Sequence, residues 1–283
     1  MKVVFVVLHY CQVNVTLDCI ESLLGLKGEK EIVVVDNASP DGSGAVLEKL
    51  FINNDLVHVI LNDSNLGFAS ANNVGYAYAK KELKAAVIVV LNNDTVIEDV
   101  DIIEKLITSN LLYKYHIIAP DIINKTGEHQ NPFALKPLTY IECIQNYRKL
   151  KLLEIIYSIP ILGDIKAKYR ISPQKEKPKQ FPFEMIVPHG AAIIYSPMWI
   201  DNEDIAFFPG TFLYLEEELL FYYAKNHHYQ IIFSPILRIH HMEDVSTNSC
   251  FKDRRKKALF LVKNHLKSYK VLMNYLRNNH LDS

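Results

Sequence analysis

Two polar segments of this chain contain carboxylates that could bind a metal ion and move a proton. Asn92-Asn93-Asp94 follows an apolar run and puts one carboxylate beside two amides, a set of oxygen donors that suits Mg²⁺ or Mn²⁺. Residues 216–218 are three glutamates at the start of an apolar helical pattern, where repulsion between like charges can raise one carboxyl pKa and create a general base. Structural roles are the alternatives: Asp94 could cap a turn, and the glutamates could simply favour the helix dipole.

Asp36 follows another apolar run in the same way. It begins the polar turn 36–43, where its carboxylate could accept hydrogen bonds from imide, amine or hydroxyl groups of a ligand. It could instead cap the helix that opens near Ser43. The glycines at positions 42 and 44 do not complete the fingerprint of a dinucleotide-binding loop, so that class of site is only weakly indicated.

Two adjacent histidines, His240 and His241, follow the apolar run 231–239. Neighbouring residues of a strand point to opposite faces, so at most one of the two could share a metal ion with Asp94. The other histidine pair, His227-His228, is interpreted as a solvated helix end.

An alternation of strands and helices must position these residues. The predicted strands are 3–8, 31–35, 57–61 and 85–91, and the predicted helices are 16–24, 44–51 and 70–81. Such alternation indicates an α/β fold with a mostly parallel sheet flanked by helices, in which ligands bind beyond the carboxyl ends of the strands. Further along the chain, an apolar strand pair is expected at 185–196 around His189-Gly190, then a helix at 215–225 and a strand at 231–239.

The composition indicates a folded protein and excludes several classes. The 283 residues carry 31 Lys and Arg against 32 Asp and Glu, a balance that argues against a nucleic-acid-binding protein. No apolar run is long enough to span a membrane, and the run 3–8 is interpreted as a buried strand rather than a signal peptide. The cysteines, Cys11, Cys19, Cys143 and Cys250, are far apart, which predicts free thiols in a reducing cytoplasm.

Two segments are strongly basic. Residues 136–179 contain ten Lys and Arg against four acids, and residues 172–179 are expected to form an exposed loop. Residues 252–277 contain nine cations and one acid, with apolar residues at helical spacing. They are predicted to form a basic amphipathic helix, which could rest on an anionic membrane surface or pack on the domain.

Taken in order, the motifs between residues 3 and 247 resemble those of the family 2 inverting glycosyltransferases of GT-A fold. The likeness is greatest to the rhamnosyltransferase-like branch of bacterial surface polysaccharide synthesis. The matching segments are His9-Tyr10 with 16–23, the loop 33–43, the segment 65–75, Leu91-Asn92-Asn93-Asp94-Thr95, Gly190-Ala191-Ala192-Ile193, the segment 212–217 and His241.

The resemblance implies a role for each matching residue. The residues that it assigns to the nucleotide sugar are His9, Tyr10, Asp36, Asn37, Ser39, Asn65, Gly67, Asn72, Asn73, Asn92, Asn93 and Asp94. It makes Glu217 the first choice for the catalytic base and Glu216 the second, with Asp94 and His241 as ligands of Mg²⁺ or Mn²⁺. Asn92 replaces the first acid of the family's Asp-x-Asp motif, which leaves Asp94 as the main acidic metal contact.

The same resemblance implies a domain plan and a reaction. Residues 1–247 form the GT-A domain, with a nucleotide-sugar half at 1–98 and an acceptor and catalytic half at 99–247 that holds a basic insertion at 136–183. Residues 248–283 form a basic helical tail; this tail and the basic insertion match no motif of the family and are predicted from composition and periodicity alone. The implied reaction transfers a sugar from dTDP-rhamnose or a UDP-hexose to a saccharide or lipid-linked saccharide, in the synthesis of capsule, O-antigen or cell wall. The expected location is the cytoplasm, and the inner surface of the membrane if the tail binds there.

Two alternative functions are kept. A sugar nucleotidyltransferase would need a Gly-rich triphosphate loop with a lysine near the N-terminus, and the segment between Leu8 and Thr16 has none. An inactive carbohydrate-binding or scaffold protein would keep the fold but would not cleave a donor.

Overall fold

The first four strands form a parallel sheet, as the apolar runs predict. The computed structural model describes residues 1–160, 183–242 and 253–281. Strands β1 (Val3–His9), β2 (Lys30–Asp36), β3 (Val57–Leu61) and β4 (Val87–Asn92) pair in the order β3-β2-β1-β4. β1, β2 and β4 are continuous Val, Ile and Leu runs because helices cover both faces of this part of the sheet.

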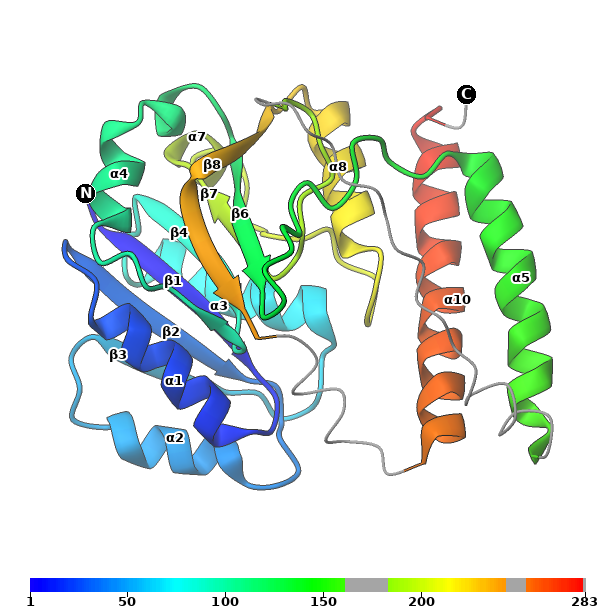
Figure 1. The fold of residues 1–283 in the computed structure, drawn as a ribbon, viewed down its shortest axis with the longest axis horizontal. Helices are drawn as coiled ribbons and strands as arrows, with labels where there is room; N and C mark the ends of the chain where they lie inside the picture. The colour runs from blue at the N-terminus through cyan, green and yellow to red at the C-terminus, as the bar shows by residue number, and fades with distance from the viewer. Residues whose placement is uncertain (161–182, 243–252, 282–283) are drawn as a thin grey trace.

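Helices connect these strands and divide between the two faces. α1 (Val13–Leu24) and α2 (Ser43–Phe51) pack on the face to which Val3, Phe5 and Val7 point, while α3 (Phe68–Lys81) packs on the face of Val4 and Val6. The result is a three-layer arrangement, seen at the left of Figure 1. Each crossover returns the chain so that every parallel strand ends at the same edge of the sheet.

The second half of the chain extends the sheet on the other side of β4. Its strands are β5 (Thr95–Val96), β6 (Ile117–Asn124), β7 (Ala192–Tyr195) and β8 (Ile231–His241). They complete an eight-stranded sheet of order β3-β2-β1-β4-β7-β6-β8-β5. β7 is antiparallel to both β4 and β6, and β8 is parallel to β6. β6 and β8 therefore run in the same direction as β4, and their carboxyl ends lie at the same edge.

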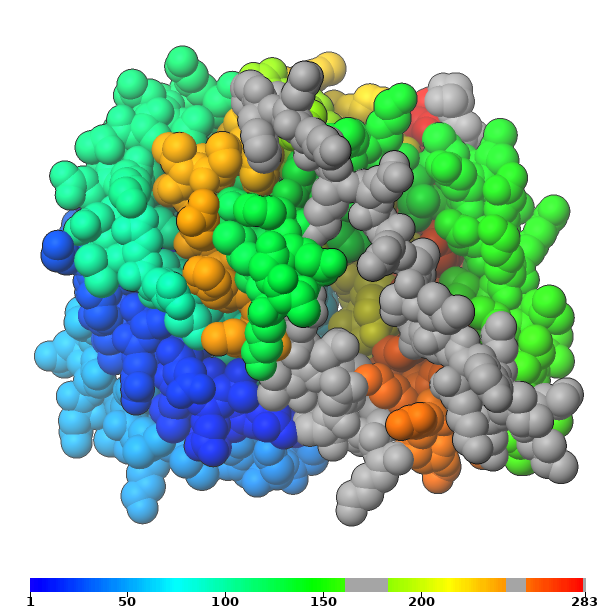
Figure 2. Space-filling model, viewed as in Figure 1, coloured from blue at the N-terminus to red at the C-terminus, as the bar shows by residue number. Residues whose placement is uncertain are grey.

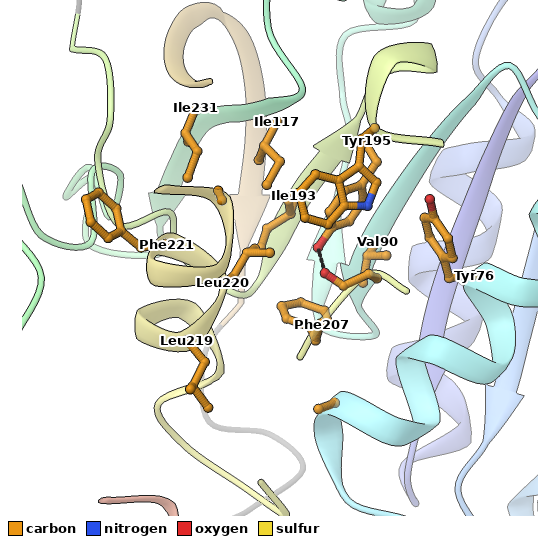
Figure 3. Close-up of a cluster of buried hydrophobic side chains, with 14 of the residues drawn as sticks. Tyr76, Val90, Ile117, Ile193, Tyr195, Phe207, Leu219, Leu220, Phe221 and Ile231 are labelled. Carbon is orange, nitrogen blue, oxygen red and sulfur yellow. Dashed lines mark hydrogen bonds between the residues drawn. The ribbon is translucent and has the colours of Figure 1, made fainter. Parts of the chain in front are cut away.

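The helix that carries the three glutamates, α8 (Glu216–Asn226), packs on the second half of the sheet. Its apolar residues join the strands in one buried cluster, which Figure 3 shows between α8 and the sheet. In that view Leu219, Leu220 and Phe221 of α8 lie with residues of β6, β7 and β8: Ile117, Ile193 and Ile231. The hydroxyl of Tyr195 in this cluster donates to the carbonyl of Ala206 at 2.7 Å, so this buried polar group is satisfied.

Two long helices lie beside α8, on the side away from the sheet. α10 (Arg254–Asn278) lies between α8 and α5 (Tyr140–Ser158) in Figure 1. The predicted amphipathic helix at 252–277 is present, and its apolar residues, including Leu266, Tyr269 and Leu272, are buried. Within the described residues, no helix has the length and hydropathy needed to cross a membrane.

The remaining elements are short. They are α4 (Ile102–Thr108), a 3-10 turn at Leu111–Tyr113 and α7 (Pro197–Ile200). α4 closes the edge of the sheet beside β8, and Trp199 of α7 is fully buried against Tyr195 of β7.

One expectation about secondary structure is wrong, and others fall outside the described residues. The segment 185–196 contains one strand, β7, and not a strand pair, because Val187 makes only an isolated bridge to Ala134. The predicted loop 172–179, residues 161–182 of the basic insertion, and Cys250 lie outside the described residues. Cys19 and Cys143 are buried free thiols, and Cys11 is buried too. Burial raises the pKa of the Cys19 thiol to about 12.

Candidate active site

Strand register brings the predicted site residues to one edge of the sheet. His9, the last residue of β1, lies opposite Asp36, the last residue of β2, and Leu8 lies opposite Asn92 at the end of β4. On the antiparallel side, Leu91 pairs with Ala192, so the start of β7 lies at this same edge. The turns after β1, β2, β4 and β8, and the turn before β7, therefore surround one region.

Asp94 and His241 form a close pair at this edge. β5 pairs with the end of β8, with Thr95 opposite His241. This pairing puts His241 Nε2 3.3 Å from Asp94 Oδ1, and both side chains are almost fully buried. The second ring nitrogen of His241, Nδ1, lies 2.8 Å from the side-chain oxygen of Gln130 and donates to it. In the neutral ring, Nε2 then presents its lone pair toward the Asp94 carboxylate.

This pair fits a divalent cation. An imidazole whose far nitrogen donates to an acceptor is the usual arrangement of a metal-ligating histidine, and an imidazole with a carboxylate suits Mn²⁺. The described residues contain no cluster of three or more His, Cys, Asp or Glu side chains that could hold a metal. Asp94 and His241 are therefore two candidate ligands within the described part of the chain. His240 faces the other way and lies 3.5 Å from Glu98, so the geometry favours His241 over His240.

The three glutamates of α8 have different surroundings. Glu218 is buried, and its Oε2 accepts a hydrogen bond from the backbone N–H of Leu138 at 2.8 Å, which fixes the chain before α5. Glu216 is buried too, and its Oε1 has no hydrogen-bond partner. Burial first, and then the charge of Glu217, raise the pKa of Glu216 to about 8. Glu217 is partly exposed, which makes it the carboxylate of the three that a substrate could reach.

Glu217 lies close to the Asp94 pair. Its carboxylate packs against Gly190, the residue before Ala191 and β7. The carbonyl of Ala191 accepts a hydrogen bond from the backbone N–H of Asn92 at 3.0 Å, two residues before Asp94. The ring of His189, on the other side of Gly190, lies edge-on to His241 with centroids 5.6 Å apart. The turn 189–191 therefore connects the glutamate to the aspartate and histidine.

The loop that leads into Glu217 has an unusual backbone and is held by α10. Tyr214 and Leu215 both have positive φ, at 77° and 67°, a conformation that is costly for residues with side chains. The ring of His265 on α10 stacks on Tyr214 with centroids 3.9 Å apart, and the hydroxyl of Ser268 donates to the carbonyl of Leu213 at 2.8 Å. α10 thereby holds the loop in the form that aims Glu217.

Asp36 is held by the polar turn that follows β2. It does not cap α2, whose N-cap residue is Gly42; instead its carboxylate accepts hydrogen bonds from the backbone N–H and hydroxyl of Ser39. The carboxylate also packs so closely on Gly44 that a Cβ there would collide with it. Ser39 in turn accepts from the backbone N–H of Cys11 at 2.8 Å, which ties this turn to the one after β1.

The turns after β2 and β3 are tied together by Asn37. Its amide nitrogen donates to Asn65 Oδ1 at 3.0 Å, and its oxygen accepts from the backbone N–H of Leu66 at 2.9 Å. Gly67 then brings the chain against the loop before α8: Phe68 N–H donates to the carbonyl of Phe212 at 2.7 Å, and a Cβ on Gly67 would collide with that carbonyl. The two halves of the sequence thus meet at Gly67.

A buried chain of hydrogen bonds connects the Asp94 turn to the Asp36 turn through His9. The amide nitrogen of Asn93 donates to Thr16 Oγ1 at 2.9 Å, which lies 2.6 Å from His9 Nδ1. His9 Nε2 lies 2.8 Å from Ser43 Oγ, whose proton goes to Asp41. A neutral His9 ring fits this pattern when Thr16 donates to Nδ1 and Nε2–H donates to Ser43. Burial lowers the pKa of His9, which favours this neutral ring.

Two further predicted residues are fully engaged within the protein. Asn73 donates to the carbonyl of Phe207 at 2.8 Å and accepts from the N–H groups of Ala206 and Phe207, so it fixes the segment before the α8 loop. Asn72 is buried and donates to the carbonyl of Phe68, while its side-chain oxygen has no partner. Tyr10 lies partly exposed just after β1.

Sequence reasoning did not single out several residues of this site. Gln130, Thr16 and Ser43 are ordinary polar residues in the sequence, and their positions depend on contacts between distant segments. His189 directly precedes the segment 190–193, which resembles a motif of the family. A role for its ring follows only from its contact with His241 in the folded chain.

Comparison with known proteins agrees with this arrangement. The model of the family described as Glycosyl transferase family 2 matches residues 4–152, which include β1 to β4 and the Asp94 turn. No curated protein sequence matches the chain.

Solved structures match over nearly the whole chain. The crystal structure of S. aureus TarS 1-349 aligns with a TM-score of 0.54 and 15% identity, covering 99% of this chain and 72% of that one. The structure of the same protein in complex with UDP-GlcNAc aligns with a TM-score of 0.54 and 16% identity over the same shares of the two chains. GalNAc-T7 with UDP, GalNAc and Mn²⁺ aligns with a TM-score of 0.55 and 14% identity, covering 86% of this chain and 43% of that one.

Proposed function

Because the chain belongs to glycosyltransferase family 2 and has the GT-A-like fold, we propose that it transfers a sugar from a nucleotide-diphosphate donor to a saccharide hydroxyl with inversion. The observation that carries this proposal is the approach of Glu217 to the Asp94 and His241 pair through the turn 189–191. Asp94 and His241 would hold a cation that stabilises the charge of the donor diphosphate, and Glu217 would take the proton of the acceptor hydroxyl.

The donor lies across the carboxyl ends of β1, β2 and β4. Asp36 and Ser39 face the nucleobase, with Tyr10 beside them, while Asn37, Asn65 and Gly67 shape the wall next to the α8 loop. His9, Asn72, Asn73 and Asn93 hold these turns through the hydrogen bonds described above. Residues 1–98 thus form the donor half, and residues 99–247 form the acceptor and catalytic half.

Glu217 is the base. It accepts the proton of the acceptor hydroxyl as that oxygen attacks the anomeric carbon from the face opposite the leaving diphosphate. Glu216, whose pKa is raised to about 8 by burial and by the Glu217 charge, keeps its proton at neutral pH. A single negative charge therefore resides on this pair, on the carboxylate that the substrate reaches.

Asp94 and His241 are the residues that would hold Mg²⁺ or Mn²⁺, and Asn92 lies beside them in the same turn. A divalent cation supplies charge stabilisation to a leaving diphosphate. The complex of GalNAc-T7 with UDP and Mn²⁺ supports this assignment by analogy of fold. Gln130 fixes the ring of His241 and with it the direction of the Nε2 lone pair.

The donor and acceptor follow from resemblance and analogy. A UDP-sugar is supported by the TarS complex with UDP-GlcNAc, and dTDP-rhamnose by the motif resemblance to the rhamnosyltransferase-like branch. The acceptor is a saccharide or lipid-linked saccharide of a bacterial surface polysaccharide, met at the cytoplasmic membrane surface. Neither a sugar nucleotidyltransferase nor an inactive scaffold is favoured, because the family match and a reachable base both support transfer.

One assay tests the reaction class. The protein is incubated with dTDP-, UDP- and GDP-sugars in the presence of Mn²⁺, and the release of free nucleoside diphosphate is measured with and without added saccharides. Slow release of the diphosphate from one donor, accelerated by an acceptor, is expected. Release of pyrophosphate from a sugar phosphate and a nucleoside triphosphate would instead indicate a nucleotidyltransferase, and no turnover of any donor would contradict the proposal.

A further inference from the structure

We propose that the outward face of α5 docks on an anionic lipid surface. This face is a stripe of aliphatic side chains that lies open to solvent: Ile141, Leu152, Ile155 and Ile159 are 64%, 60%, 60% and 44% exposed. Positions 141, 148, 152 and 155 follow one another at intervals of seven, four and three residues, so they share one side of the helix, and Ile159 comes directly after its last residue. α5 buries Cys143 and Tyr157 on its inner side, so it is apolar on two sides.

Cations outnumber acids beside the stripe, and both acids of the helix are engaged: Glu142 accepts from Thr139 in the capping box, and Glu154 pairs with Lys151. Arg148 lies within the stripe between Ile141 and Leu152, and Lys149 and Lys151 lie to either side of it; all three are exposed. Lys151 pairs with Glu154 at 2.9 Å on the surface, an interaction of little energetic weight. A helix that lies in a membrane interface has this composition, because lysine and arginine beside an apolar stripe can extend toward lipid headgroups.

The position of α5 leaves this face open. In Figure 1, α5 is the outermost helix, beyond α10 and away from the sheet, and Figure 2 shows its side chains at the margin of the molecule. α10 covers the opposite side of α5, where Leu150 and Leu153 pack with Val262 and Leu266. Because the stripe lies at the edge of the molecule, it can contact a flat bilayer without any rearrangement of the fold.

The structure moves the membrane hypothesis from the C-terminal helix to α5. The apolar residues of α10 that suggested membrane binding are the ones that pack on α5 and α8, so they are not available to lipid. α10 can contribute only charge: Lys256, Lys263, Lys267 and Lys270 are exposed and recur at helical spacing on its outer side. The apolar contact and part of the basic field must therefore come from α5.

An anionic bilayer fits this face better than a second copy of the chain does. Two α5 helices that packed stripe to stripe would bring Arg148 and Lys149 of both copies into one apolar interface, where like charges are costly. Anionic headgroups instead compensate these cations, and each lysine or arginine near the surface strengthens the attraction. The two occupants therefore predict different responses to lipid charge.

Vesicle sedimentation of the full chain tests the proposal. The vesicles are made of phosphatidylcholine alone or of equal parts of phosphatidylcholine and phosphatidylglycerol. Wild-type protein is expected to bind the anionic vesicles and to be released by salt. The double variant Leu152→Ser, Ile155→Ser should bind at least about tenfold more weakly, and Arg148→Gln, Lys149→Gln roughly fivefold more weakly for each charge removed.

A matched control separates this surface from general exposure of aliphatic residues. Leu50 and Ile52, at the end of α2, are 57% and 73% exposed, and α2 lies on the other side of the molecule from α5 in Figure 1. The variant Leu50→Ser, Ile52→Ser should bind vesicles as the wild type does, and all three variants should keep the wild-type melting temperature.

Three outcomes would overturn the proposal. They are equal vesicle binding by the α5 variant and the wild type, equal binding to neutral and anionic vesicles, and a wild-type dimer in solution that the α5 variant dissociates. None of these outcomes bears on sugar transfer, because none of the substituted residues belongs to the candidate active site.

Discussion

The carboxylate of Glu217 lies directly against Gly190, so closely that a Cβ at position 190 would collide with Oε1. Gly190 precedes the strand that pairs with β4, and β4 leads into Asp94. The position of Glu217 relative to Asp94 is therefore set by the β4–β7 pairing, and the absence of a side chain at Gly190 leaves room for the carboxylate.

Substitution of Gly190 by alanine is expected to displace Glu217 while leaving the fold intact. Gly190 does not have positive φ, so alanine is allowed by the backbone, and the added methyl group must push the carboxylate aside. A shift of about 1 Å at a catalytic group can reduce turnover roughly a hundredfold. Steady-state kinetics measure the loss. Gly25→Ala is the control, because a Cβ there meets nothing closer than 3.5 Å, and equal kinetics for both variants would contradict this account.

Glu217→Gln should reduce turnover by about 10² to 10⁴ because glutamine cannot accept the proton of the acceptor hydroxyl. Donor binding, measured by calorimetry with the intact nucleotide sugar, should stay near the wild-type value. Glu216→Gln is the matched variant: glutamine resembles the protonated acid that burial maintains at position 216, so turnover should change little. If the two variants exchange these effects, Glu216 is the base.

The stability of the protein should depend on pH through Glu216. Its pKa is raised from 4.5 to about 8 in the folded state, first by burial and then by the charge of Glu217. Between these values the folded protein binds more protons than the unfolded chain, so the free energy of unfolding falls as pH rises from about 4.5 to 8. Glu216→Gln removes this penalty. The melting temperature of this variant should exceed that of the wild type, and the difference should grow between about pH 5 and about pH 8. A difference that stays constant with pH would contradict the raised pKa of Glu216.

The hydrogen-bond chain through His9 is tested by an isosteric change at Thr16. Thr16→Val leaves the amide of Asn93 and Nδ1 of His9 without their buried partner, which costs about 1 to 3 kcal/mol. The turns that carry Asp36 and Asp94 then lose their connection, so affinity for nucleoside diphosphate with Mn²⁺ should fall roughly tenfold. Thr16→Ser keeps the hydroxyl and should behave as wild type in calorimetry. Equal affinities for the valine and serine variants would show that the chain has no such role.

Binding of Mn²⁺ should depend on Gln130 as well as on the two ligands. Asp94→Asn and His241→Ala each remove a ligand and should abolish measurable binding. Gln130→Leu removes only the acceptor that orients the His241 ring and should weaken binding about 10- to 100-fold. Titration of the protein with Mn²⁺, followed by electron paramagnetic resonance, measures the three affinities. His240→Ala is the control, because His240 faces Glu98 instead; loss of binding in that variant would reverse the choice between the histidines.

Local sequence patterns were sufficient to predict the parallel strands β1 to β4. The apolar runs at β1, β2 and β4 are buried on both faces, so each shows as a continuous apolar segment, and the polar residues after them must lie at one edge. The same reasoning predicted that Asp36 and Asp94 lie at that edge. It also predicted that His240 and His241 lie at the end of a strand, because the residues before them form an apolar run.

Contacts between distant segments were beyond this reasoning. Gln130 lies in an irregular segment with no periodicity. Its backbone N–H bonds to Ile122 of β6, and the pairing of β6 with β8 brings His241 within reach of its side chain. The burial of Glu216 and the exposure of Glu217 depend on how α8 rotates against the sheet, which three adjacent glutamates do not reveal. The sequence also could not show what the apolar side of α10 contacts, because an amphipathic helix has the same pattern whether that side meets lipid or another helix such as α5.

The hold of α10 on the loop before Glu217 has a consequence for any shortened form of the protein. The stacking of His265 on Tyr214 and the hydrogen bond from Ser268 to Leu213 join this loop to a helix that contributes no strand to the sheet. Removal of α10 would therefore leave all eight strands in the chain but release Tyr214 and Leu215 from the contacts that hold their positive φ.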